Sequence, residues 1–389
     1  SASVGDPAAA WAAARALPSA AAFLDAGEAW LERFPTDPRR AEVEAALVAR
    51  RRAEPRWILP AAGALAPGLA SAREALYVCD GRIAQRGLWS WAWATRQRTE
   101  HAVPPGLIDL QVLAAPSRQG LWAVQVRDGA KRLITFLPRL SPRRSSSSVA
   151  PAPPAALEDP AFDHGSSFLL SGDGRALLAL AGERWLLCGL QPDGSLAIEL
   201  AGSSPLPSAS VRVVTLTPDG THAVFAGRDP DEQVSVDALR VVRLADDAVV
   251  VKRMFTARVK ALQGLPGGWF LVGTDIGQLI EADVRGERWD MLANPEGELI
   301  EFVGHKAVDG EHSALRWTPA GLLYAYGRLD RGGRVLQVWR LAERALVEEG
   351  EFPAYGTIQL SPDGRYLAGS VKDRVEVWDR WLPGEWAPR

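Results

Sequence analysis

A four-residue turn that recurs along the second half of the chain is the feature that most limits its fold. It reads SPDG from residue 361, and related turns read SGDG from 171, TPDG from 217, LPGG from 265 and TPAG from 318. Proline presets the backbone of such a turn, and glycine tolerates the positive φ angle that the turn needs. A short apolar run follows each turn, and a second strand-like run such as RVLQVWRL or RVEVWD comes after it.

The turns are spaced 43 to 53 residues apart. A period of this length, with four short strands in each period, is typical of propeller blades. The sequence therefore predicts an all-β propeller over residues 57–389, with seven four-stranded blades of about 48 residues each. Counts of six or eight blades are also compatible with the spacing. We expect residues 56–60 to supply the outer strand of the last blade, which gives circular closure and removes open sheet edges.

The last two units resemble the WD-repeat family, and the resemblance spans about residues 166–380. It implies a structural hydrogen-bond network within the blades, and a platform whose loops and rims bind other proteins. The residues that match positions of this network are Ser370, Asp373 and Trp378 in the last unit, His305, Asp330 and Trp339 in the unit before it, and the turn residue Asp275. The last unit has no matching histidine, and most units have WR or nothing in place of the WD dipeptide.

Residues 1–56 differ in kind from the rest, because their apolar residues follow helical spacing. We expect a small α-helical segment that resembles a tetratricopeptide-type helix pair plus one helix. Phe23, Trp30, Leu31 and Phe34 share one helix face. Since a single repeat cannot bury its own apolar face, this face is predicted to dock on the propeller or on a partner.

Residues 139–160 interrupt the pattern with four consecutive serines and several prolines. This composition predicts a flexible insertion. One interpretation is a solvated loop. The other is a regulatory loop in which Arg143, Arg144, Ser145 and Ser146 form a site for a basic-directed kinase or a trypsin-like protease.

Composition excludes several classes of partner. The formal net charge is −3 and no basic block is present, which argues against a nucleic-acid surface. No apolar run reaches about 18 residues, so we expect no membrane span. Cys79 and Cys188 both lie in apolar runs, and free buried thiols favour a reducing, cytoplasmic location. Of the 44 basic residues 39 are arginine, which together with abundant alanine indicates a GC-rich bacterial genome.

Motifs that carry chemistry are absent from the sequence. The five histidines form no metal-binding pattern, no Cys-x-x-Cys pair occurs, and there is no nucleophile elbow or phosphate-binding loop. We therefore predict no catalytic residue, no metal and no cofactor. In LWSWAWAT, alternate residues Trp89, Trp91 and Trp93 share one strand face, which indicates either core packing or an exposed patch for a partner.

Three functional classes follow from this pattern. The first is a non-catalytic protein–protein interaction scaffold or regulatory subunit of a bacterial multiprotein complex, in a signalling or defence system. The second is a propeller enzyme, a hydrolase or lyase, with a site at the channel. The third is a protease or kinase substrate, or a sensor, that is switched through residues 139–160.

Overall fold

A computed structural model describes most of the chain. The residues that it does not describe are 1–5, 62–66, 72–73, 83–84, 102–108, 114–120, 128–130, 138–166, 172–174, 182, 191–195, 208–210, 230–236, 294–299, 303–314, 319–320, 330–333, 354, 362 and 381–389. The predicted insertion at 139–160, with Arg143, Arg144, Ser145 and Ser146, lies outside the described residues, as do His305 and Asp330.

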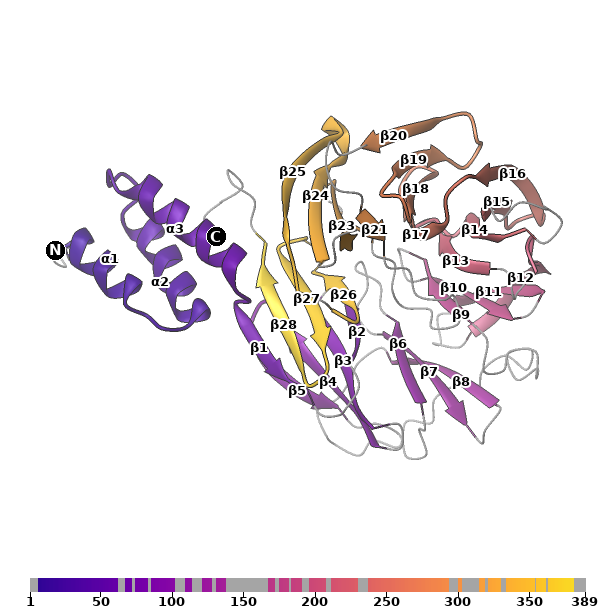
Figure 1. The fold of residues 1–389 in the computed structure, drawn as a ribbon. Helices are drawn as coiled ribbons and strands as arrows, with labels where there is room; N and C mark the ends of the chain where they lie inside the picture. Colours follow the sequence, from indigo (N-terminus) through magenta and orange to yellow (C-terminus); the bar gives the residue numbers. More distant parts are fainter. Residues whose placement is uncertain are drawn as a thin grey trace.

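Three helices, α1 (Pro7–Arg15), α2 (Ala20–Arg33) and α3 (Arg40–Ala53), form what we call the helical arm. Asp6 and Ser19 cap the first two helices, each accepting a hydrogen bond from a backbone N–H of the first turn. The arm stands outside the ring of sheets, beside β1 and β28 (Figure 1).

The strands of the described residues form seven sheets. Blade 1 is β2 (Gly68–Ser71), β3 (Ala75–Arg82), β4 (Gln85–Ala92) and β5 (Arg98–His101); the second sheet is β6 (Asp109–Leu113), β7 (Leu121–Arg127) and β8 (Lys131–Leu137); blade 3 is β9 (Ser167–Leu170), β10 (Ala176–Ala181), β11 (Arg184–Leu190) and β12 (Leu196–Ser203); blade 4 is β13 (Val211–Leu216), β14 (His222–Arg228), β15 (Asp237–Arg243) and β16 (Ala248–Phe255). Blade 5 is β17 (Val259–Leu265), β18 (Trp269–Thr274), β19 (Leu279–Asp283) and β20 (Trp289–Ala293); blade 6 is β21 (Ile300–Phe302), β22 (Leu315–Trp317), β23 (Leu322–Leu329), β24 (Arg334–Arg340) and β25 (Ala345–Glu351); the closing blade is β26 (Ile358–Leu360), β27 (Tyr366–Val371), β28 (Arg374–Asp379) and β1 (Trp57–Pro60). A short 3₁₀ helix, Leu341–Glu343, joins β24 to β25.

The prediction of seven four-stranded blades is wrong: among the described residues six sheets have four strand positions, five of them with one strand at each position and blade 6 with two strands at the innermost one. In blade 6, β21 and β22 share the innermost position, because both pair with β23. The remaining sheet has three strands among the described residues, β6 to β8. The segment that follows β8 is rich in serine and proline. This composition offers no alternating apolar pattern from which a fourth strand of this unit can be counted in the sequence.

Circular closure is confirmed. β1 pairs antiparallel with β28, with Trp57 opposite Val377 and Pro60 opposite Arg374. The strand that follows the helical arm therefore completes a blade whose other three strands come from the end of the chain (Figure 1). Proline is tolerated at the end of this outer strand, because one side of an edge strand has no neighbouring strand to which a backbone N–H would donate.

Two of the recurring turns show the glycine geometry that their sequences predict. Gly220 and Gly364 have φ angles of 70° and 73°, which only glycine adopts at little cost. Each donates its N–H to the residue three positions earlier, Thr217 and Ser361, at 2.8 Å. At these two positions the recurring glycine thus has the turn role that its spacing indicated.

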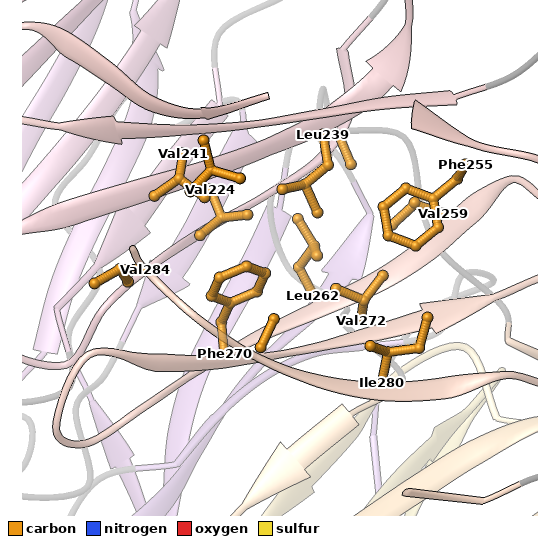
Figure 2. Close-up of a cluster of buried hydrophobic side chains, with 13 residues drawn as sticks. Val224, Leu239, Val241, Phe255, Val259, Leu262, Phe270, Val272, Ile280 and Val284 are labelled. Atoms are coloured by element: carbon orange, nitrogen blue, oxygen red, sulfur yellow. The ribbon is translucent and has the colours of Figure 1, made fainter. Parts of the chain in front are cut away.

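The hydrophobic core lies between neighbouring blades. Figure 2 shows the cluster between blades 4 and 5, where Val224 and Leu239 meet Phe270 and Val272. Trp89 and Trp91 of LWSWAWAT are buried in the same way, against the closing blade. The core-packing interpretation of that sequence is therefore confirmed, and the exposed-patch interpretation is wrong.

The outer strands of blades 3 to 6 each carry a shift in register by one residue. The extra residues are Glu199, Val250, Leu292 and Val347. A bulge twists a strand locally and disrupts its ladder, which makes the exposed edge a poor template for another strand. In each of these four blades, therefore, a one-residue bulge makes the outer edge less able to pair with a strand of another chain.

Candidate functional site

The arm meets the propeller through a cluster of charged side chains around Arg56, the residue just before β1. The side chain of Arg56 is fully buried. It donates hydrogen bonds to Glu28 of α2 at 2.8 Å and to Asp25 of α2 at 2.5 Å, and it also bonds to Asp379 at the end of β28. Arg56 thus ties the arm to the last strand of the chain.

Two further guanidinium groups complete the centre of this cluster. Arg365, from the turn between β26 and β27, reaches Glu28 and Asp379, both at 3.2 Å. Arg51 of α3 donates to Glu28 at 2.9 Å. Burial alone would raise the pKa of Glu28, but Arg56, Arg365 and Arg51 outweigh it and hold the pKa below its usual value. Glu28 is therefore ionised at neutral pH.

Ion pairs at the edge of the cluster extend it to the blades on either side. Arg96 of blade 1 lies 2.7 Å from Asp25, and Arg52 of α3 lies 3.3 Å from Glu348 on β25 of blade 6. We call the whole set, Asp25, Glu28, Arg51, Arg52, Arg56, Arg96, Glu348, Arg365 and Asp379, the junction cluster. It attaches the arm to three adjacent blades at once.

Arg96 belongs to a recurring pattern. Arg96, Asp247 and Arg344 are the non-glycine residues with positive φ in the described part of the chain, at 60°, 53° and 52°. All three lie in the turn between the third and fourth strands of a blade, and each bonds across to a neighbour. Asp247 accepts from Trp185 of blade 3, and Arg344 contacts Asp290 of blade 5, whereas Arg96 reaches the arm. The arm is thus held by the contact that elsewhere joins blade to blade.

An aromatic layer lies under the junction cluster. The ring of Trp57 contacts the guanidinium groups of Arg56 and Arg96 at 4.8 and 5.0 Å. It packs against Trp91 and Tyr366, with ring centroids 5.0 and 5.5 Å away. Guanidinium groups stack well on indole faces, so this layer supports the positive side of the cluster.

Tyr366→Phe should not destabilise the protein. The Tyr366 hydroxyl is buried, and it has no hydrogen-bond partner among the described residues. An unsatisfied buried hydroxyl costs about 1–3 kcal/mol, so we expect a gain of up to about 1 kcal/mol in the free energy of unfolding, measured with urea. Tyr324→Phe is the matched control, because the Tyr324 hydroxyl donates to the carbonyl of Gly364 at 2.8 Å. A loss for Tyr366→Phe as large as that for the control would contradict this expectation.

The predicted network residues of the closing blade have different hydrogen-bond or ion-pair partners and do not form one network. Ser370 accepts from the N–H of Thr357 at 3.0 Å, and Trp378 donates to the hydroxyl of Tyr355 at 2.6 Å. Tyr355 in turn donates to Glu376. Asp373 is mostly exposed, and its carboxylate lies 3.6 Å from Arg374. The tryptophan therefore bonds through a tyrosine to a carboxylate two residues before it.

The other matched residues also have local partners. Trp339 of blade 6 donates to Gln337, again two residues before the tryptophan, at 3.2 Å. Asp275 accepts from the N–H of Arg258 at 2.9 Å, which joins the β18–β19 turn to the entry of β17. These contacts lie within the blades that contain the residues. We propose that they are structural.

The four apolar residues assigned to docking lie inside the arm. Phe23, Trp30, Leu31 and Phe34 have exposed fractions of 8% or less. Their cluster is completed from the neighbouring helices by Trp11, Val43 and Leu47. The prediction that this face lies against the propeller or a partner is wrong, because α1 and α3 cover it.

Few groups outside the junction cluster are arranged for chemistry. Ser90 Oγ lies 2.7 Å from Nε2 of His101, and both side chains are buried. Burial lowers the pKa of His101, so its imidazole is neutral at pH 7. A serine nucleophile needs substrate access and a third group that orients the histidine, yet Nδ1 of His101 has no partner in the described part of the chain. Among the described residues there is no group of three metal-binding side chains and no helix long and apolar enough to cross a membrane.

Comparisons with known proteins identify the fold. No family model matches the chain, and no curated protein matches it. The WD40 β-propeller domain of Doa1 is similar, with a TM-score of 0.50 and 13% identity over 86% of this chain and 99% of that one. A chain of the mitotic checkpoint complex has a TM-score of 0.53 and 13% identity, over 84% and 95% of the two chains. Hydrazine synthase of Kuenenia stuttgartiensis has a TM-score of 0.51 and 11% identity, over 83% and 97%.

These similarities confirm a β-propeller as the architecture. At such low identity they show the fold alone. They do not confirm the tetratricopeptide resemblance of the arm, which stays a prediction.

Proposed function

We propose that this chain is a non-catalytic protein–protein interaction scaffold, a regulatory subunit of a bacterial cytoplasmic multiprotein complex in signalling or defence. The propeller fold supports this proposal, since propellers present loops and rims on a rigid ring. One of the similar structures is part of a mitotic checkpoint complex. Fold similarity does not identify a partner, so the proposal depends on a particular surface.

That surface is the outer edge of the closing blade beside the arm. Ile58 on β1 is 59% exposed, the highest value among the large apolar side chains of the described residues. Arg98 lies close by, because it donates to the carbonyl of Pro60 at 2.7 Å and stacks on Trp89. An exposed apolar anchor beside an arginine held by an aromatic ring is typical of an interface hot spot. The exposure of Ile58 is the observation that carries the proposal.

Affinity purification from the native bacterium, with quantitative mass spectrometry, tests it. Ile58→Thr keeps a β-branched residue in the strand but removes the apolar anchor, so we expect the co-purified partner to be lost. Val249→Thr is the matched control, since Val249 is 38% exposed on β16 of a distant blade. Equal recovery of the same proteins with both variants would overturn the proposed surface.

A further inference from the structure

The apolar clusters of the described residues divide between arm and propeller. The arm has a core of its own, built around Trp11, Leu24 and Leu47. The cluster against which Trp57 of β1 packs, around Trp91 and Tyr366, contains propeller residues only. None of the clusters that consist wholly of described residues combines side chains of the two parts. Separation of the arm would therefore uncover little apolar surface, and that surface is what normally holds packed units together.

The bonds between arm and propeller are instead charged pairs. Those with described geometry join Asp25 to Arg56 and Arg96, Glu28 to Arg56 and Arg365, Arg51 to Asp379, and Arg52 to Glu348. The attraction within a buried ion pair is largely offset by the cost of removing both charges from water. Separation of the arm returns these charges to water, so the net cost of separation is small.

The link between the two parts allows such a movement. The last turn of α3 ends at Ala53, and Arg56 precedes the strand that closes the ring. Glu54 at the helix end has extended backbone angles, φ −153° and ψ 153°, and Pro55 follows it. Rotation about this short extended link would move the arm without disturbing β1.

We infer that the helical arm is a detachable unit: it leaves the propeller as an intact three-helix body when the charge balance of the junction cluster is disturbed. The docked and undocked forms would then present different surfaces beside Ile58. Only the link from this movement to partner binding beside Ile58 rests on the proposed function. The movement itself needs no partner.

Removal of one carboxylate should shift the balance towards the undocked form. Asp379 is fully buried and faces Arg56, Arg365 and Arg51. In Asp379→Asn the docked state would keep these three cations against Glu28 and Asp25. Leaving buried charge uncompensated is costly, so the ratio of undocked to docked molecules should rise roughly a hundredfold or more. Separation of the arm relieves that cost, because it carries Arg51 of α3 away and opens Arg56 and Arg365, which remain on the propeller, to water.

The distance between arm and propeller is the direct measurement. Spin labels on Ala12→Cys of α1 and Lys252→Cys of β16 report it in the full chain by double electron–electron resonance, because both positions are exposed and both native cysteines are buried. We expect one narrow distance for the otherwise native chain at low ionic strength. Asp379→Asn should give a broad distribution, with the helical circular dichroism signal unchanged.

Two further variants make the test specific. Asp246→Asn breaks an exposed pair with Arg243 far from the arm and should leave the distance narrow. Arg96→Gly removes the contact to Asp25 at a position whose positive φ suits glycine, and should broaden the distribution without backbone strain. A narrow, unchanged distance in both Asp379→Asn and Arg96→Gly would overturn the inference. So would loss of the helical signal together with the broadening, since the arm would then depend on the propeller for its fold.

The result is independent of the partner experiment. The distance measurement uses no partner, so unchanged distances would contradict the movement of the arm but not the binding surface at Ile58. Equal recovery of partners with both affinity variants would contradict that binding surface but not the movement of the arm.

Discussion

Removal of residues 356–389 is expected to leave no folded monomer. This segment holds β26, β27 and β28, which carry the inner three positions of the closing blade. It contributes Tyr366, Val375 and Val377 to the cluster shared with blade 1, and Leu367 and Trp378 to the cluster shared with blade 6. Each large apolar side chain stabilises the fold by about 1.5–3 kcal/mol when buried, so these five together approach the whole stability of a typical domain.

Size-exclusion chromatography and thermal unfolding of the shortened chain would measure this effect. The matched control is removal of residues 1–53, which takes away the arm and its separate core but removes no residue from the propeller clusters of the described residues. We expect the control to unfold cooperatively as a monomer. A cooperative monomer from the chain that lacks 356–389 would contradict the circular arrangement of the blades.

Local patterns were sufficient to predict the blade as a unit. The proline and glycine of each turn act on neighbouring residues, so their spacing carried the period, and the pairing of β1 with β28 followed from the missing fourth strand of the last unit. The blade count was harder to predict because it depends on a sheet whose sequence lacks the turn. In the part of the chain that the structure describes, β6 to β8 form a sheet of three strands, so the prediction of seven four-stranded blades is one too many.

The junction cluster could not be predicted, because its members are far apart in the sequence. Arg56 and Asp379 are separated by 323 positions, and neither alternation nor helical spacing says which charges will meet. One signal was available. Asp379 is the aspartate of the dipeptide WD in the last blade, where blade 6 has Trp339 followed by Arg340. A carboxylate that replaces an arginine at an equivalent position indicates a different neighbour, and here that neighbour is the arm.

The core of the arm was also not predicted, although its members lie close together in the sequence. From the sequence, the apolar face formed by four large side chains is expected to need the propeller or a partner to cover it. α1 is short and rich in alanine, yet its Trp11 packs against Phe23 and Trp30, with ring centroids 5.8 and 6.3 Å apart. Gly27 of α2 also lets α3 approach closely, since an added Cβ would lie 2.4 Å from a methyl of Leu47. A single tryptophan and a single glycine gave the three helices a shared core.

Gly264→Ala should be among the most damaging single substitutions in the propeller. Gly264 lies on β17 where blades 4 and 5 meet, and an added Cβ would stand 2.4 Å from the carbonyl oxygen of Leu216 and 3.1 Å from the Cα of Thr217. Both obstacles are backbone atoms, so no rotamer change relieves the clash and the two inner strands must move apart. That movement would also break the hydrogen bond from the N–H of Gly264 to Oγ1 of Thr215, at 3.1 Å.

We expect the free energy of unfolding to fall by about 2–4 kcal/mol, which combines the usual cost of overpacking with that of one lost buried hydrogen bond. Chemical denaturation with tryptophan fluorescence would measure it, since Trp269 and Trp289 lie in the same blade. Gly350→Ala is the matched control: Gly350 lies on β25, its added Cβ meets nothing within 4 Å, and its backbone needs no positive φ. Alanine is also less flexible than glycine in the unfolded chain, so the control should be neutral or slightly stabilising. If the two variants unfold alike, the close approach of blades 4 and 5 at Gly264 does not hold the ring together.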